Sequence, residues 1–203
     1  MPEKAEKILV VRTYAPNNVQ QLALQTIADA AFGNDFFRTD GLHPLPSEFL
    51  MAYHGETMTG FLCIHRLDRE GLNRFFPKVT PILAPFSDEA AVVACLRTIA
   101  VHKNFRRKGI AHLMVEVAMR NFAHDVQQVF SLCWRDAQGH SAFERILQRK
   151  GFGELAYFND YWHLDSLQRG YQCAVCGVPP CRCGAVVMSK YNATKAIAPL
   201  PSG

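Results

Sequence analysis

The sequence predicts an α/β domain of the α+β kind, in which a mixed sheet is flanked by helices and a small cysteine-rich segment lies near the end. Three observations support this fold class. The 203 residues are 49% hydrophobic and 20% charged, which suits one domain with a substantial core. Strand-like and helix-like patterns alternate along most of the chain. Four of the seven cysteines lie within eleven residues.

The first half of the chain predicts a strand, a helix and a hairpin. Ile8–Thr13 reads as a strand, and Pro16 followed by two asparagines opens a helix that runs to about Phe32. Residues 33–46 contain glycines and prolines and are expected to form a loop with at most one short helical turn. Residues 48–53 and 58–65 are strand-like and flank a short turn, so we expect a hairpin.

The middle of the chain predicts a strand followed by the clearest helix. Residues 70–89 contain three prolines and are expected to form no helix, but a lid or a wall. Residues 91–101 form an apolar run typical of a buried strand, and a basic turn follows at residues 102–108. From Gly109 to about residues 121–125, apolar residues recur with the spacing of a buried helix face.

The last part of the predicted domain contains a strand at residues 126–134, a capped helix and further strands. Ser141 and Glu144 have the spacing of a capping box, and Gly151 lies where that helix should end. Residues 154–164 read as one or two strands. We therefore predict a domain at residues 1–166, a cysteine-rich appendage at 167–191 and a weakly structured tail at 192–203.

Composition excludes several classes of protein. The net charge of +4 is too small for a protein whose whole surface is built to hold nucleic acid, which argues against nucleic acid as a partner. No apolar stretch reaches the roughly 20 residues that span a bilayer, and no secretory signal is recognisable, so no membrane partner is expected. A reducing cytoplasm is the expected location, where clustered cysteines more often bind metal than form disulfides.

The basic turn has the features of a phosphate site. Arg106, Arg107 and Lys108 precede Gly109, and the predicted helix begins directly afterwards. A helix N-terminus presents free amides, glycine allows close approach of a ligand, and the basic side chains add charge. A basic turn by itself is more often a solvated connector.

The pattern Arg106-x-x-Gly109-x-Ala111 between a strand and an amphipathic helix resembles the pyrophosphate-binding motif of the GNAT family of N-acetyltransferases. The order of elements from Ile8 to Asp165 is similar to that family, including the helix that ends before Gly151. This resemblance implies a mostly antiparallel sheet and an acetyl-CoA co-substrate. The residues that it assigns to acetyl-CoA binding are Ile99, Ala100 and Val101 on the strand and Arg106, Arg107, Lys108, Gly109, Ile110 and Ala111 in the turn.

The resemblance implies direct attack of a primary amine, from a small molecule or a protein, on the acetyl group. Many family members carry a tyrosine where this chain has Leu147, and the usual asparagine is missing near His140 and Ser141. Tyr157 or Tyr161 could replace the tyrosine, although strand aromatics usually belong to the core or a pocket wall. We therefore assign no catalytic acid.

No catalytic base is assigned either. His65, Asp68 and His102 are candidates, each of them more often a surface or hydrogen-bonded residue, and relay through water is an alternative. Cys95 and Cys133 lie in apolar strands, where a cysteine is usually a small core residue.

The cysteine cluster predicts a metal site. Cys173, Cys176, Cys181 and Cys183 would repel one another as thiolates unless a cation neutralised them, and four cysteines form a closed, structural zinc site. The segment Cys173-x-x-Cys176-Gly resembles a zinc knuckle. Because Cys181-x-Cys183 is a tight spacing, His163 could replace one cysteine, or one cysteine could be left free. Zinc is favoured over an iron–sulfur cluster or a redox pair.

Two other functions remain open from the sequence: an acetyl-CoA-binding protein without catalysis, and a nucleic-acid-binding module that uses the knuckle and the basic turn. A homodimer is one option for the assembly. The identity of the amine that accepts the acetyl group should depend on three segments, namely residues 33–46, residues 70–89 and the cysteine segment. Five aromatic residues suggest an acceptor pocket, although core packing explains them about equally well: Phe75, Phe76, Phe86, Tyr157 and Trp162.

Overall fold

The computed structural model describes residues 8–33, 37, 47–83, 91–122 and 125–191. The strands are β1 (Ile8–Thr13), β2 (Ser47–His54), β3 (Thr57–Leu67), β4 (Val92–Val101), β5 (Val126–Arg135), β6 (Gly153–Phe158) and β7 (Gly184–Tyr191). The helices are α1 (Asn18–Phe32), α3 (Arg69–Phe75), α4 (Ile110–Asn121), α5 (Ala142–Arg149) and α6 (His163–Arg169). A 3₁₀ turn at Lys103–Phe105 follows β4.

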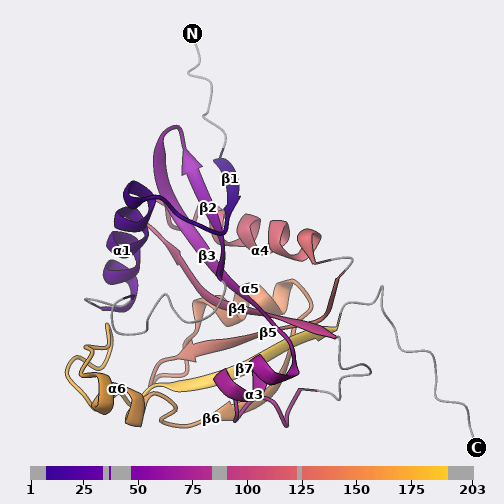
Figure 1. Ribbon diagram of the computed structural model, residues 1–203. Coiled ribbons are helices and arrows are strands. Elements are labelled where there is room, and N and C mark those ends of the chain that lie inside the picture. The colour runs from indigo at the N-terminus through magenta and orange to yellow at the C-terminus, as the bar shows by residue number, and fades with distance from the viewer. Residues whose placement is uncertain (1–7, 34–36, 38–46, 84–90, 123–124, 192–203) are drawn as a thin grey trace, which may run out of the picture.

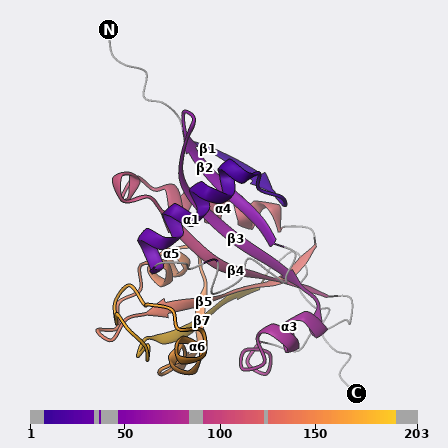
Figure 2. The ribbon, with the colours of Figure 1, turned by 60° about the vertical axis from the view of Figure 1, so that its left-hand side comes forward.

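One seven-stranded sheet in the order β1-β2-β3-β4-β5-β7-β6 forms the centre of the molecule (Figure 1). Neighbouring strands are antiparallel except β4 and β5, which are parallel. Alternate residues of β4 enter different cores: Ala94 packs with α4 and α5, and Cys95 packs with α3. Helices α4 and α5 therefore cover one face, and α1 and α3 cover the other (Figure 2). The predicted mixed, mostly antiparallel α/β fold is confirmed.

Local sequence explains the elements that were predicted. Asn17 caps α1 through a full capping box with Gln20, and Leu24, Ile27 and Ala28 are buried against the sheet. Strands β2 and β3 form the predicted hairpin, closed by the pair His54 and Thr57. Strands β1, β4 and β5 and helix α4 lie where the sequence predicts them.

The prediction that residues 70–89 contain no helix was wrong at its start. Asp68 accepts a hydrogen bond from the Gly71 amide at 2.7 Å and caps α3. Leu72 anchors this short helix because its side chain is fully buried. The first proline of the segment, Pro77, lies after the helix has ended, so it limits α3 without breaking it.

The prediction for residues 154–164 was correct only in its first part. Strand β6 ends at Phe158, and Asp160 adopts a positive φ of 47° that turns the chain. Helix α6 then begins at His163 and continues through the predicted boundary at residues 166–170, ending at Gly170 with φ of 68°. The strand therefore ends before Asn159 and Asp160, although the aromatic residues that suggested a strand continue to Trp162.

Strand β7 was not recognised in the sequence. It lies between β5 and β6, and Ala185 to Met188 are fully buried. The predicted appendage at residues 167–191 therefore contains an interior strand of the sheet, next to the edge strand β6. The cysteine segment is the connection between α6 and β7.

No helix among the described residues is both long and apolar enough to cross a bilayer. Some predictions concern residues outside the described ranges. These are most of the loop at residues 33–46, Phe86 and the tail at residues 192–203.

Candidate functional site

The candidate site is built around the place where β4 and β5 separate. The two parallel strands pair only between Val92 and Cys95 on β4 and Val126 and Phe130 on β5. Beyond this point, Ser131 donates a buried hydrogen bond to the Leu96 carbonyl at 2.8 Å. Among the described residues, the rest of β4 pairs with β3 alone, and β4 and β5 diverge toward their carboxyl ends (Figure 1).

The unpaired edge of β4 carries Ile99, Ala100 and Val101, the three strand residues predicted to bind the cofactor. Their partners on the other edge are residues 60–62 of β3. A bulge at Arg97 shifts the register between β3 and β4 at the point of divergence. Peptide groups along the edge that faces β5 are therefore available to pair with an extended ligand.

The turn after β4 brings together the predicted basic residues. Arg106 donates from Nε to the Val101 carbonyl at 3.1 Å, which folds the turn back onto the end of the strand. Arg107 and Gly109 both adopt positive φ, 66° and 79°, which turns the chain sharply between β4 and α4. Arg106, Arg107 and Lys108 are all exposed. The turn is therefore positively charged and open to solvent.

Helix α4 begins at this turn and supplies its amides. The Leu113 amide is the first in α4 that donates to a carbonyl one helical turn earlier, that of Gly109 at 3.0 Å. The amides of Ile110 and Ala111 therefore have no carbonyl partner one turn earlier. Ile110 is buried in the core and fixes the start of the helix. A Cβ atom at Gly109 would meet nothing within 4 Å. The turn and helix end together have the backbone amides and basic side chains that an anion site requires.

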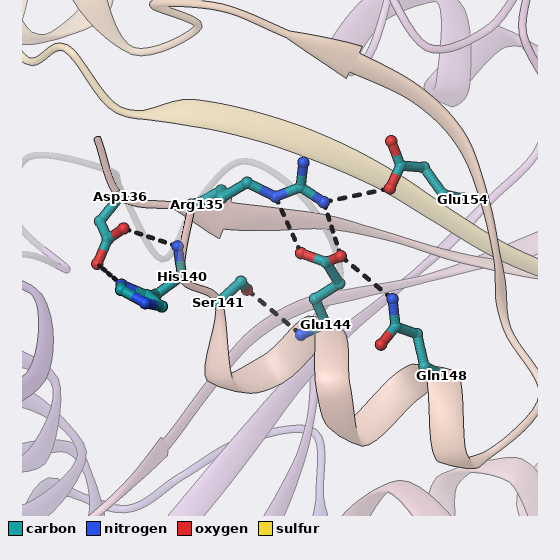
Figure 3. A network of polar contacts seen from close by, with 7 residues as sticks. All are labelled: Arg135, Asp136, His140, Ser141, Glu144, Gln148 and Glu154. Atoms are coloured by element: carbon teal, nitrogen blue, oxygen red, sulfur yellow. Dashed lines mark hydrogen bonds and ion pairs between the residues drawn. The ribbon is translucent and has the colours of Figure 1, made fainter. Parts of the chain in front are cut away.

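The opposite side of the divergence, at the end of β5, is held by an ion-pair network (Figure 3). Arg135 donates to the Glu144 carboxylate at 2.6 and 3.1 Å and to Glu154 at 3.1 Å. The hydrogen bond from Arg135 to Glu144 raises the pKa of the arginine above its usual value. Because Arg135 and Glu144 are largely buried, this network fixes β5 to α5 and β6.

The predicted capping box is only half formed. The Ser141 hydroxyl accepts from the Glu144 amide at 3.3 Å, as expected. The Glu144 carboxylate binds Arg135 and accepts from Gln148 at 3.2 Å (Figure 3). The ion pair with a strand residue replaces the return bond to Ser141, because a nearly buried carboxylate is better compensated by a guanidinium than by an amide.

The two candidate proton donors, Tyr157 and Tyr161, are separated in the structure. Leu147, which stands where many family members have a tyrosine, is fully buried in the core that α4 and α5 share. Tyr157 lies under the Arg135 guanidinium, at 5.0 Å from the ring centroid. Tyr161 packs with Phe158 and Trp162 at the other core, beside α3. Burial raises the pKa of Tyr161, while nearby Arg97 opposes this shift.

The candidate bases all have structural contacts. His65 is buried on β3 with Nδ1 3.3 Å from the Ser47 hydroxyl. Asp68 caps α3, and His102 accepts from the Asn104 amide at 3.4 Å. Asp68 and His102 therefore have defined roles in local folding.

Three of the cysteines are core residues, as the sequence predicts. Cys63, Cys95 and Cys133 are at most 4% exposed. Burial raises the pKa of Cys133 to about 12 and raises the pKa of Cys95 further. Such thiols stay protonated at neutral pH and are poor nucleophiles.

The other four cysteines come together at one point. The sulfur atoms of Cys173, Cys176, Cys181 and Cys183 all lie within 4.8 Å of one another. Cys176 Sγ is 3.4 Å from Cys183 Sγ and 3.9 Å from Cys181 Sγ. A tetrahedral zinc ion with bonds of about 2.3 Å to sulfur spaces its ligands about 3.8 Å apart. The arrangement therefore fits zinc, and the cluster does not include His163.

The knuckle, residues 173–183, is organised by its backbone. Cys173 and Gly177 exchange two hydrogen bonds of 2.9 Å, and Gly177 adopts φ of 76°. Cys176 Sγ accepts from the Arg182 amide at 3.4 Å. Burial raises the pKa of this thiol, but the hydrogen bonds from Arg182 and the neighbouring cysteines outweigh it and lower the pKa overall.

The two last cysteines differ from Cys176. Burial raises the pKa of Cys181 to about 12 and raises the pKa of Cys183 further. Without a cation, these thiols hold their protons. Ser166 on α6 was missed in the sequence: its fully buried hydroxyl accepts from the Cys181 amide at 2.8 Å and donates to the His163 carbonyl.

Comparisons with known proteins agree with this geometry. A model of the acetyltransferase (GNAT) family matches residues 19–152. Arabidopsis thaliana NAA60 in complex with acetyl-CoA is 12% identical with a TM-score of 0.63, covering 91% of this chain and 98% of that chain. The Escherichia coli ribosomal-protein-S18-alanine N-acetyltransferase is 13% identical with a TM-score of 0.61, covering 96% and 99%. At these identities the likeness concerns the fold. A comparison with curated proteins found no match.

Proposed function

Because the chain belongs to the acetyltransferase (GNAT) family, we propose that it transfers an acetyl group from acetyl-CoA to a primary amine by direct attack in a ternary complex. The observation that carries this proposal is the basic turn at Arg106–Ala111. It joins an unpaired strand edge to a helix N-terminus and matches the family's motif for pyrophosphate. We also propose a reducing cytoplasm as the location.

The turn would hold the pyrophosphate of acetyl-CoA. The amides of residues 107–111 would donate to its oxygens, and the positive end of α4 would favour its charge. Arg106, Arg107 and Lys108 are exposed around the turn and would add charge-assisted contacts. Gly109 would allow close approach because nothing occupies the space next to its Cα.

The pantetheine arm would follow the unpaired edge of β4. Ile99, Ala100 and Val101 would supply main-chain groups to it, in the manner of an added strand. A backbone amide on this edge of β4 would polarise the acetyl carbonyl. Holding the thioester and the amine side by side would supply much of the rate through proximity.

The reaction requires a neutral amine. Its nitrogen forms a bond to the acetyl carbon, the carbon–sulfur bond of the thioester breaks, and the coenzyme A thiolate takes up a proton while the amine loses one. Direct attack is favoured over an acyl-enzyme because Cys95 and Cys133, the β4 and β5 thiols, are buried with raised pKa values. We assign neither the proton donor nor the acceptor to a residue.

We further propose that Cys173, Cys176, Cys181 and Cys183 hold one structural zinc ion. The sulfur distances support it, and four thiolates leave no open position for catalysis. Zinc bound here would stabilise the fold of the knuckle and would take no part in acetyl transfer.

Calorimetry with acetyl-CoA, followed by thiol detection over a panel of amines, tests the proposed function. We expect saturable binding of acetyl-CoA and thiol release that depends on the amine. Binding without thiol release would favour a non-catalytic acetyl-CoA-binding protein, for which the buried Leu147 in place of a tyrosine is the supporting observation. Salt-dependent affinity for RNA or DNA without acetyl-CoA binding would overturn the proposal.

A further inference from the structure

The knuckle lies between two parts of the molecule that share the core under α4 and α5 and that meet within the sheet where β4 pairs with β5. Helix α1 packs on β3 and β4, whereas the knuckle leads into β7, which pairs with β5 and β6. Between these parts, β4 and β5 pair over only a short stretch. Figures 1 and 2 show the knuckle beside the end of α1, on the side toward which β4 and β5 diverge.

On one side, the knuckle contacts the C-terminal end of α1. The Ala174 amide donates to the Phe32 carbonyl at 3.2 Å, which is one of the last carbonyls of the helix. The Gln172 carbonyl lies so close to Gly33 that a Cβ atom there would be 2.0 Å from it. Gly33 also adopts φ of 116°. Only glycine permits this contact.

On the other side, the knuckle is attached to α6 and β7. Cys181 donates its amide hydrogen to Ser166, and Cys183 directly precedes Gly184, which pairs with Arg135 at the end of β5. The knuckle has little apolar burial of its own, since Val175 and Val178 are 48% and 69% exposed. Its cysteines are therefore the main groups that can hold its shape.

We propose that the zinc-loaded knuckle is a clamp that ties α1 to the β5–β7–β6 part of the sheet. The clamp spans the side on which β4 and β5 diverge, so zinc loading sets how tightly the amine substrate binds and leaves acetyl-CoA binding unchanged. This inference rests on the proposed function, because it takes the edge of β4 as the place of the thioester. Acetyl-CoA would contact the turn and that edge, neither of which includes a knuckle residue.

Two variants of the full-length protein test the clamp in different ways. Cys183→Ser removes a metal ligand, and Gly33→Ala leaves all four ligands but places a methyl group against the Gln172 carbonyl. Gly139→Ala is the matched control, because Gly139 also has a positive φ, 79°, and a Cβ atom there would meet nothing within 4 Å. Zinc content, hydrogen exchange and acetyl-CoA affinity are measured for each. Thiol release is followed with spermidine and with a hexapeptide that has a free α-amine.

We expect Cys183→Ser to lose its zinc and Gly33→Ala to keep it. In both variants, hydrogen exchange should be faster at the Ala174 amide and in the last turn of α1. The KM for the amine should rise roughly tenfold, while acetyl-CoA affinity should stay within about twofold of the wild-type value. Gly139→Ala should change none of these. Unchanged exchange at α1 in both variants, or an amine KM equal to that of Gly139→Ala, would overturn the clamp.

The two proposals fail separately. A wild-type protein that does not bind acetyl-CoA, or that releases no thiol with any amine of the panel, refutes the proposed function. Even then, faster hydrogen exchange at α1 in Cys183→Ser and Gly33→Ala would support the claim that the knuckle ties α1 to the β5–β7–β6 part of the sheet. Equal losses of acetyl-CoA affinity and amine affinity would contradict the clamp, because it predicts that only amine binding depends on the knuckle.

Discussion

The turn Arg106–Ala111 and the knuckle are both built from polar groups, but they use them in opposite ways. In the turn, the basic side chains are exposed, the first amides of α4 have no partner one turn back, and Gly109 faces open space. In the knuckle, four sulfur atoms lie within 4.8 Å of one another, and backbone amides bond to Cys176 and Ser166.

This difference is the one expected between a site for an exchangeable ligand and a site for a permanent one. A co-substrate must enter and leave at every turnover, so its site leaves donors free until it arrives. A structural ion remains bound and its site is closed. Changes in the knuckle should therefore alter stability most, and changes in the turn should alter binding most.

The largest effect is expected from Cys183→Ser. Cys183 is fully buried next to β7, so losing the metal should lower the free energy of unfolding by roughly 3–5 kcal/mol. Zinc content should fall from one ion per chain to none. Urea unfolding and elemental analysis measure both quantities.

Cys63→Ser is the matched control for this variant, since it makes the same chemical change at a buried cysteine outside the knuckle. It should keep one zinc ion per chain and lose only about 1–2 kcal/mol. If the wild-type protein contains no stoichiometric metal, the zinc assignment is wrong.

A smaller effect is expected from Glu144→Gln at the end of β5. This change leaves the Arg135 guanidinium, whose side chain is 19% exposed, without its main counter-charge, and should lower the free energy of unfolding by about 3 kcal/mol. Glu154→Gln removes the more exposed partner, at 44%, and should lower it by less than about 1 kcal/mol. Equal losses of unfolding free energy in the two variants would contradict the expectation that the Arg135–Glu144 pair stabilises the fold more than the Arg135–Glu154 pair.

Arg107→Glu should affect binding instead of folding. It places a negative charge beside the proposed pyrophosphate, and the Kd of acetyl-CoA should rise about tenfold, equivalent to about 1.4 kcal/mol. Because Arg107 is exposed, unfolding should change little.

Arg120→Glu reverses the same charge at the far end of α4, where Arg120 pairs with Glu116, and should leave the Kd within about twofold. Calorimetry at low and at high salt distinguishes a local contact from a general charge effect. Equal weakening by both variants would place the cofactor elsewhere.

The sequence was sufficient for features that depend on local patterns. The periodic apolar residues of α4, the apolar runs of β4 and β5 and the motif at Arg106–Ala111 depend on neighbouring residues, and the structure has these elements where they were predicted. The resemblance to the GNAT family rested on the same features and is confirmed by the family model. The clustering of four cysteines was also predictable, because they are close in the chain.

Features that depend on distant residues were missed. The place of β7 between β5 and β6 is decided by burial on two faces, which a short apolar run does not reveal. The half-formed capping box of α5 results from Arg135, whose proximity to Glu144 is produced by the fold. Likewise, only the structure brings Ser166 to Cys181 and Phe32 to Ala174.

A smaller effect on acetyl-CoA affinity than that of Arg107→Glu is expected from Gly109→Ala, which tests whether the open turn depends on backbone geometry. Gly109 adopts φ of 79°, so alanine should lower the free energy of unfolding by about 1 kcal/mol, and no steric clash adds to this because the added methyl group meets nothing within 4 Å. Gly139→Ala has the same φ and should lose a similar amount.

Acetyl-CoA affinity should distinguish these two glycine variants. Only at Gly109 does relaxation of the strained backbone move the amides of Ile110 and Ala111, so its Kd should rise by roughly threefold to tenfold while that of Gly139→Ala stays the same. An unchanged Kd in both variants would mean that the basic side chains, and not the backbone of the turn, determine how the pyrophosphate is held.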